Sequence, residues 1–176
     1  MRYVPFFACM LAAADTQREV YVDVAPAFVI GKPQQNAKWN MEPSIRVCEN
    51  TGISQSRISQ AVRYWENAGY TFDDIIKDSS PMCMDARYGE IIITIPESGF
   101  ADEHMASTRI YTSKSTGDIV KAKIQILPKN ARKDRVIEHE IGHSLGWMHY
   151  PQKYHIMHPT WHMGGYERTG IRKQID

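Results

Sequence analysis

Residues 139–149 read His139-Glu140-Ile141-Gly142-His143-Ser144-Leu145-Gly146-Trp147-Met148-His149. On a helix, residues four apart lie one turn above each other, so His139 and His143 can direct ring nitrogens to a common point. Gly146 predicts the end of that helix, because glycine adopts a left-handed backbone without a Cβ clash. A chain that turns back there brings in a third nitrogen from His149. We therefore predict a metal centre with the ligands His139, His143 and His149.

The donor set favours zinc and a catalytic site. Zn²⁺ binds imidazole nitrogens at about 2.0–2.1 Å in a tetrahedral arrangement, and catalytic sites keep one position open for water. Glu140, beside the first ligand, is expected to take a proton from that water as it attacks a carbonyl and to pass it to the leaving amine. The motif therefore predicts amide hydrolysis, with one Zn²⁺ as cofactor and Glu140 as the catalytic residue.

The competing interpretation is a set of ordinary helix histidines. One histidine alone would favour it. Three histidines, a glutamate and a glycine at fixed offsets arise by chance on the order of once in 10⁵ chains of this length at average residue usage. The metal centre is therefore the better interpretation.

The pattern H-E-x-x-H-x-x-G-x-x-H resembles that of the metzincin zinc peptidases, which also carry a methionine in a tight turn beneath the metal. Here Ile156-Met157-His158-Pro159 supplies that turn eight residues beyond the third histidine, and looks most like the matrixin branch (matrix metalloproteinases). The resemblance covers about residues 44–165. It implies that Met157 forms the floor under the imidazoles, and that Pro159 begins the outer wall of the pocket for the substrate residue after the scissile bond.

The resemblance also implies a fold. We expect an α/β (α+β) zincin-like domain with a twisted, mixed, five-stranded sheet, a backing helix, an active-site helix and a short subdomain after the Met-turn. An antiparallel edge strand containing Thr108 and Ile110 would bind the substrate through main-chain hydrogen bonds.

Several features depart from the matrixin pattern. Tyr150 follows the third histidine, where matrixins usually carry serine, and no tyrosine lies two residues after Met157. A cysteine-switch propeptide is not recognisable. The loop that holds calcium and a second zinc in matrixins is not recognisable around residues 96–112, so neither ion is expected. His155, His158 and His162 are interpreted as turn and rim residues.

The remaining pattern predicts alternating strands and helices. The helix Ser54–Ala68 has one apolar stripe, an N-cap serine and a terminating Gly69. A second helix is expected from an Asn130 cap to about Leu145. The predicted strands are Ile45–Glu49, Thr71–Lys77, Glu90–Ile95, Thr108–Ser113 and Ile119–Leu127.

We place the compact domain at residues 44–176 and an N-terminal extension at residues 1–43. The extension has strand-like runs at Val20–Val24 and Phe28–Ile30, followed by a polar linker or wrapping loop at Gly31–Pro43. Residues 1–14 are compatible with a signal peptide cleaved after Ala14, or with a buried or docking tail. The extension is a candidate contact for an assembly partner.

Composition limits the alternatives. The net charge of +1 gives no electrostatic case for nucleic acid or an anionic membrane, and no apolar run is long enough to span a bilayer. Residues 51–70 resemble a helix-turn-helix recognition helix, but a strand-like run replaces the helix that should precede it. Cys48 and Cys83 are either a disulfide pair or two buried thiols. A bridge would fit an extracellular, secreted or virion-associated protein better than a cytoplasmic one.

The primary hypothesis is a zinc endopeptidase that acts on a peptide or protein substrate. The alternative from another class is a zinc-binding structural or adhesive module, for example of a particle, with little or no turnover. A third hypothesis is a latent enzyme that residues 1–43 block.

Overall fold

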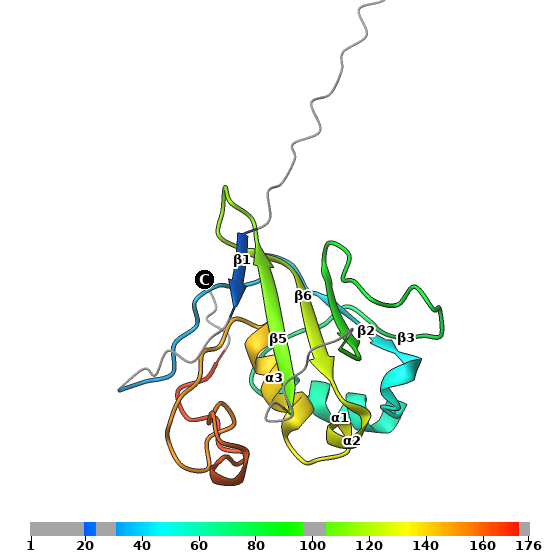
Figure 1. Ribbon diagram of the computed structural model, residues 1–176. Coiled ribbons are helices and arrows are strands. Elements are labelled where there is room, and N and C mark those ends of the chain that lie inside the picture. The colour runs from blue at the N-terminus through cyan, green and yellow to red at the C-terminus, as the bar shows by residue number, and fades with distance from the viewer. Residues whose placement is uncertain (1–19, 24–30, 97–104, 173–176) are drawn as a thin grey trace, which may run out of the picture.

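The computed structural model describes residues 20–23, 31–96 and 105–172. A six-stranded mixed sheet has the order β1-β5-β6-β4-β2-β3, and α1 and α3 lie on one face of it (Figure 1). The strands are β1 Val20–Asp23, β2 Ser44–Cys48, β3 Ile75–Asp78, β4 Glu90–Thr94, β5 Ala106–Thr112 and β6 Ile119–Ile126. The helices are α1 Gln55–Glu66, α2 Pro128–Ala131 and α3 Val136–Ser144, with short 3₁₀ turns at Glu49–Thr51 and Trp161–Met163. The predicted α+β class is confirmed.

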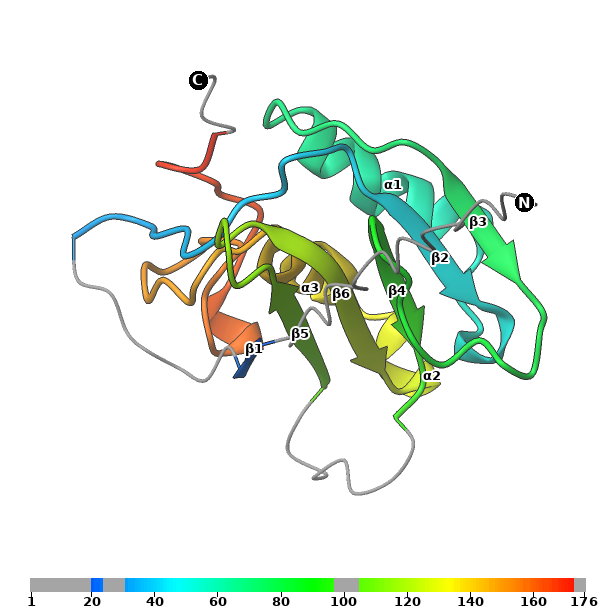
Figure 2. The ribbon, with the colours of Figure 1, turned by 90° about the horizontal axis from the view of Figure 1, so that it is seen from above.

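The side chains of strand β2 pack in two separate clusters, one on each face of the sheet. Successive side chains of a strand point to opposite faces. Ile45 and Val47 enter the main core with residues of α1 and α3, whereas Cys48 packs in a second cluster with Cys83. The loop of residues 79–89 covers this second face, and as a result every residue of β4 is buried. Figure 2 shows the strands side by side from β1 to β3.

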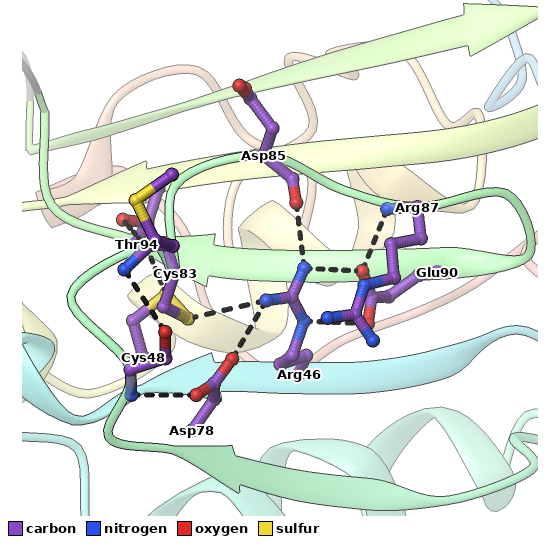
Figure 3. A network of polar contacts seen from close by, with 10 residues as sticks. Arg46, Cys48, Asp78, Cys83, Asp85, Arg87, Glu90 and Thr94 are labelled. Atoms are coloured by element: carbon purple, nitrogen blue, oxygen red, sulfur yellow. Dashed lines mark hydrogen bonds and ion pairs between the residues drawn. A yellow bond between two sulfur atoms is a disulfide. The ribbon is translucent and has the colours of Figure 1, made fainter.

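The second face holds a disulfide and a buried ionic network (Figure 3). Cys48 and Cys83 are joined by a disulfide, which decides between the two alternatives for this pair. Arg46, only 4% exposed, lies 2.7 Å from Glu90 and 2.9 Å from Asp78. Burial, the largest single effect, raises the pKa of the Glu90 carboxyl, but the hydrogen bonds from Arg46 and the Arg87 amide, together with the charges of both arginines, outweigh it and lower that pKa. The disulfide and a further bond from Arg46 to Asp85 O at 2.7 Å bind the loop of residues 79–89 to β2.

Helix α1 begins as predicted. Its stripe of Ile58, Ala61, Val62 and Trp65 is buried, and the Ser54 hydroxyl accepts a hydrogen bond from the Arg57 amide at 3.2 Å. Trp65 is the largest fully buried side chain, and its indole N–H donates to Glu138 O at 2.8 Å. This bond joins α1 to α3.

The prediction of one helix from Asn130 to Leu145 is wrong. Two helices occupy this region, because Arg135 has a left-handed backbone (φ 69°) that interrupts helical hydrogen bonding. Pro128, which suits a first helical position, begins α2. The Asn130 side chain does not cap α3 but donates to Met105 O at 2.9 Å. Helix α3, which carries His139 and His143, therefore begins at Val136.

The prediction that the antiparallel strand lies at the sheet edge is also wrong. Strand β5 pairs antiparallel with β6, as expected, but its other side pairs antiparallel with β1, with Val20 opposite Thr112 and Asp23 opposite Arg109. An open edge presents unpaired N–H and C=O groups, and β1 satisfies those of β5. Strands β2–β6 correspond to the five predicted ones, and β1 adds a sixth from within the N-terminal extension.

Other boundaries differ less. Strand β3 is shorter than the predicted Thr71–Lys77, because residues 71–74 form an irregular approach to it. Residues 1–14 and the Phe28–Ile30 run lie outside the described residues. Among the helices that the structure describes, none is both long and apolar enough to cross a membrane.

Candidate metal centre

Helix α3 and the turn after it carry the three predicted ligands. His139 and His143 lie one turn apart on the helix, which ends at Ser144. Gly146 has φ 92°, and a Cβ at this position would overlap the carbonyl oxygen of Ala37. The glycine is therefore required both by its backbone conformation and by this close approach. The reversal brings His149 beside the two helical histidines.

The three Nε2 atoms converge on one point. Nε2 of His143 lies 3.0 Å from those of both His139 and His149, and the last two are 3.3 Å apart. A tetrahedral zinc with bonds of about 2.0–2.1 Å separates its nitrogen ligands by about 3.3–3.4 Å. The cluster has the dimensions of such a site and can hold a metal ion.

Two backbone carbonyls fix the ring orientations. Nδ1 of His139 lies 2.7 Å from Ile156 O, and Nδ1 of His143 lies 2.7 Å from Trp147 O. Because a carbonyl only accepts, both Nδ1 atoms carry the hydrogen, and the Nε2 lone pairs face the centre of the cluster. His149 Nδ1 is buried without a hydrogen-bond partner among the described residues. Three facing nitrogens in this arrangement are satisfied by a shared cation.

Burial keeps these histidines neutral. Desolvation lowers the pKa of His139 and of His149 to about 4, and that of His143 well below its usual range. Neighbouring histidines add to the shift by mutual repulsion. Metal ions bind only neutral imidazole, so the environment that disfavours protonation also favours coordination.

Glu140 lies between α3 and β5. The Thr108 hydroxyl donates to Glu140 Oε2 at 2.6 Å, and burial raises the pKa of this carboxyl to about 7 despite that hydrogen bond. A group with a pKa near neutrality can both accept and return a proton. Thr108 thus holds the carboxylate, and its expected contact with substrate stays a prediction.

Met157 lies under the helix. It is fully buried, and a Cβ on Gly142 would collide with its sulfur and lie 2.7 Å from Trp65. The absence of a side chain at Gly142 thus lets the methionine turn reach the back of α3. The Tyr150 amide donates to Met157 O at 2.9 Å, which ties the turn to the residue after the third ligand.

The other predicted residues are placed as follows. Ile110 is 3% exposed, its side chain belongs to the main core, and it lies opposite Val22 of β1, so its main-chain contact with substrate stays a prediction. Pro159 is partly exposed beyond the Met-turn. His155 Nδ1 accepts from the Met157 amide, and His158 Nδ1 accepts from the Thr160 amide, which fits their interpretation as turn residues.

The groups that orient the histidine rings could not be identified from the sequence. The carbonyls of Trp147 and Ile156 carry no sequence signal, because every residue has one. The contact of Thr108 with Glu140 joins residues 32 positions apart. The segment of residues 34–39, assigned to a loop, proves to contact the turn between the second and third ligands.

No protein-family model matches the chain, and no curated protein is significantly similar to it. The function is therefore argued from the geometry of the site.

Proposed function

We propose that the chain is a zinc-dependent endopeptidase of metzincin type. The observation that carries the proposal is the convergence of three neutral imidazoles at 3.0–3.3 Å beside a buried glutamate. Three protein ligands leave a fourth position for water, and a zinc held there would supply a Lewis acid for the substrate carbonyl and a more acidic water. Imidazole also suits copper, iron and nickel, so metal analysis of the purified protein belongs to the test.

Glu140 moves the proton in the proposed reaction. Its carboxylate takes a proton from water as the water oxygen bonds to the peptide carbonyl carbon. It then returns a proton to the amide nitrogen as the C–N bond breaks, and the second proton of the water passes from the new carboxyl group to the amine, which leaves a carboxylate and an ammonium group. Thr108 keeps one carboxylate oxygen fixed, so that the other is available for this transfer.

Glu140→Gln tests the chemistry. General acid–base catalysis contributes about 10²–10⁴-fold, so the variant should lose at least about a hundredfold in peptide cleavage while it still binds zinc. Removal of metal by a chelator should abolish cleavage, and added Zn²⁺ should restore it. The matched control is Glu66→Gln on the exposed face of α1, which should cleave like the wild type. Cleavage that survives both chelation and Glu140→Gln would end the proposal.

The pairing of β1 with β5 favours a second candidate, the structural or adhesive module. An extended peptide needs the edge of β5, and β1 takes that edge from Arg109 to Thr112. Either β1 leaves during activity, as in a latent enzyme, or it stays and the zinc is structural. The disulfide between Cys48 and Cys83 supports an oxidising compartment for both candidates.

A further inference from the structure

A short segment far upstream of the ligands lies along the turn that carries His149. Residues 34–39, named here the metal-site brace, form an isolated antiparallel bridge between Gln35 and Trp147. The Gln35 side chain donates to Leu145 O at 2.8 Å, and the Trp39 indole N–H donates to Ser144 O at 2.8 Å. The brace is therefore bonded to the connection between the second and third ligands.

Main-chain bonds complete this contact. The Asn36 amide donates to Gly146 O at 3.0 Å, and the Met148 amide donates to Gln34 O at 2.9 Å. The last carbonyls of a helix have no partner within it. Here the brace satisfies the carbonyl of Ser144, the last residue of α3, and those of Leu145 and Gly146 just beyond it. The Ala37 carbonyl oxygen lies in the space that a Cβ on Gly146 would need.

The connection between His143 and His149 also contains Trp147, whose carbonyl contacts the His143 ring. Trp147 O orients the ring of His143, and the Trp147 indole N–H donates to Tyr70 OH at 2.8 Å. His149 follows two residues later, and its Nδ1 has no hydrogen-bond partner among the described residues. His149 therefore lacks a ring partner of the kind that fixes His139 and His143, and its position depends on the backbone that the brace holds.

We propose that Gln35 and Trp39 are positioning residues of the metal centre, which set its affinity through the turn that carries His149. The inference rests on the metal centre of the proposed function, but not on peptide cleavage. Groups that orient metal ligands commonly change affinity by about 10–100-fold when they are removed. The metal-site brace thus makes residues 34–39 part of the site, although none of them is a ligand.

The experiment uses full-length Trp39→Phe and Gln35→Met, each of which removes a donor and keeps most of the side-chain volume. Zn²⁺ affinity is measured by competition with a chromophoric chelator, and ligand geometry by the absorption spectrum of the Co²⁺ form. Each variant should bind Zn²⁺ at least about tenfold more weakly and show an altered Co²⁺ spectrum.

The matched control is Thr94→Val, which removes one buried hydrogen bond from a side chain to Cys83 O on the other face of the sheet. It should lower the free energy of unfolding of the metal-free protein without changing Zn²⁺ affinity or the Co²⁺ spectrum. Wild-type affinity and spectrum in both brace variants would overturn the inference, as would equal losses in Thr94→Val. If the wild type binds zinc but cleaves no peptide, the peptidase proposal fails and the role of the brace stands.

Discussion

At the scale of single residues, the site depends on ionisable groups kept neutral by burial. The three ligands have pKa values lowered by desolvation, and Glu140 has one raised to about 7 by the same cause. The lowered pKa values keep the imidazoles neutral, which is the form that binds a metal ion. The raised pKa places the glutamate where proton transfer is reversible at neutral pH. Burial therefore keeps the histidines neutral and also brings the pKa of Glu140 close to neutrality.

These shifts predict how the stability of the metal-free protein depends on pH. A histidine with a lowered pKa in the folded state contributes stability that is present above about pH 6.5 and lost as the pH falls toward 4. Glu140 acts oppositely, because its folded-state pKa is raised from 4.5 to about 7: its contribution grows as the pH falls from 7 to 4.5. With three histidines against one glutamate, the free energy of unfolding should fall between pH 7 and pH 4.5.

Glu140→Gln separates the two contributions. The variant lacks the opposing carboxyl, so its free energy of unfolding should fall more steeply than that of the wild type over the same interval. Denaturant titrations of both metal-free proteins at several pH values measure the difference. Parallel pH profiles would contradict a neutral, buried Glu140 in the metal-free protein.

Among the elements, helix α3 and the Met-turn pack directly against each other at the metal centre. The contact is close because Gly142 has no side chain, with Met157 and Trp65 in the space that a Cβ would need. Gly142→Ala should therefore destabilise the protein by about 1–3 kcal/mol through overpacking, although alanine in a helix interior normally stabilises by about 1 kcal/mol relative to glycine. Zinc affinity should fall as well, because both helical ligands flank this position.

Thermal and denaturant unfolding of the metal-free variant give the sign of the effect. Gln60→Ala on the exposed side of α1 is the control for helix propensity and should change the free energy of unfolding little. An increase in the free energy of unfolding in Gly142→Ala would contradict the close packing of Met157 against Gly142.

The elements also explain what the sequence could and could not predict. The ligand spacing, the Gly146 turn and the stripe of α1 are local patterns, because periodicity within about a dozen residues decides them. The break at Arg135 was missed because a left-handed arginine has no composition signal. The β1–β5 pairing and the brace were missed because they join segments about 90 to 110 residues apart, as Val22 with Ile110 and Gln35 with Leu145 do. Such pairings depend on tertiary geometry.

At the scale of the whole molecule, the N-terminal extension has two contacts with opposite consequences. Residues 34–39 bond to the turn that carries His149, whereas β1 pairs with the edge of β5 that an extended substrate would use in the proposed reaction. On the far face, the disulfide and the bond from Arg46 to Asp85 O hold the loop of residues 79–89 against β2, and the Thr94 hydroxyl holds it against β4. If the chain is a latent peptidase, β1 is the element whose departure would free the edge of β5 for a peptide.

Proline substitutions in β1 test this role in the full-length chain. Along an edge strand, successive N–H groups face the neighbouring strand and solvent in turn, so only one of Tyr21→Pro and Val22→Pro removes a hydrogen bond to β5. That variant should lose hydrogen-exchange protection in β5 and cleave a peptide substrate faster, by about tenfold for each 1.4 kcal/mol of lost pairing. The other variant is its matched control and should stay closer to the wild type. If β5 loses its protection while cleavage and peptide binding remain unchanged, β1 does not block the substrate, and the latent-enzyme interpretation fails.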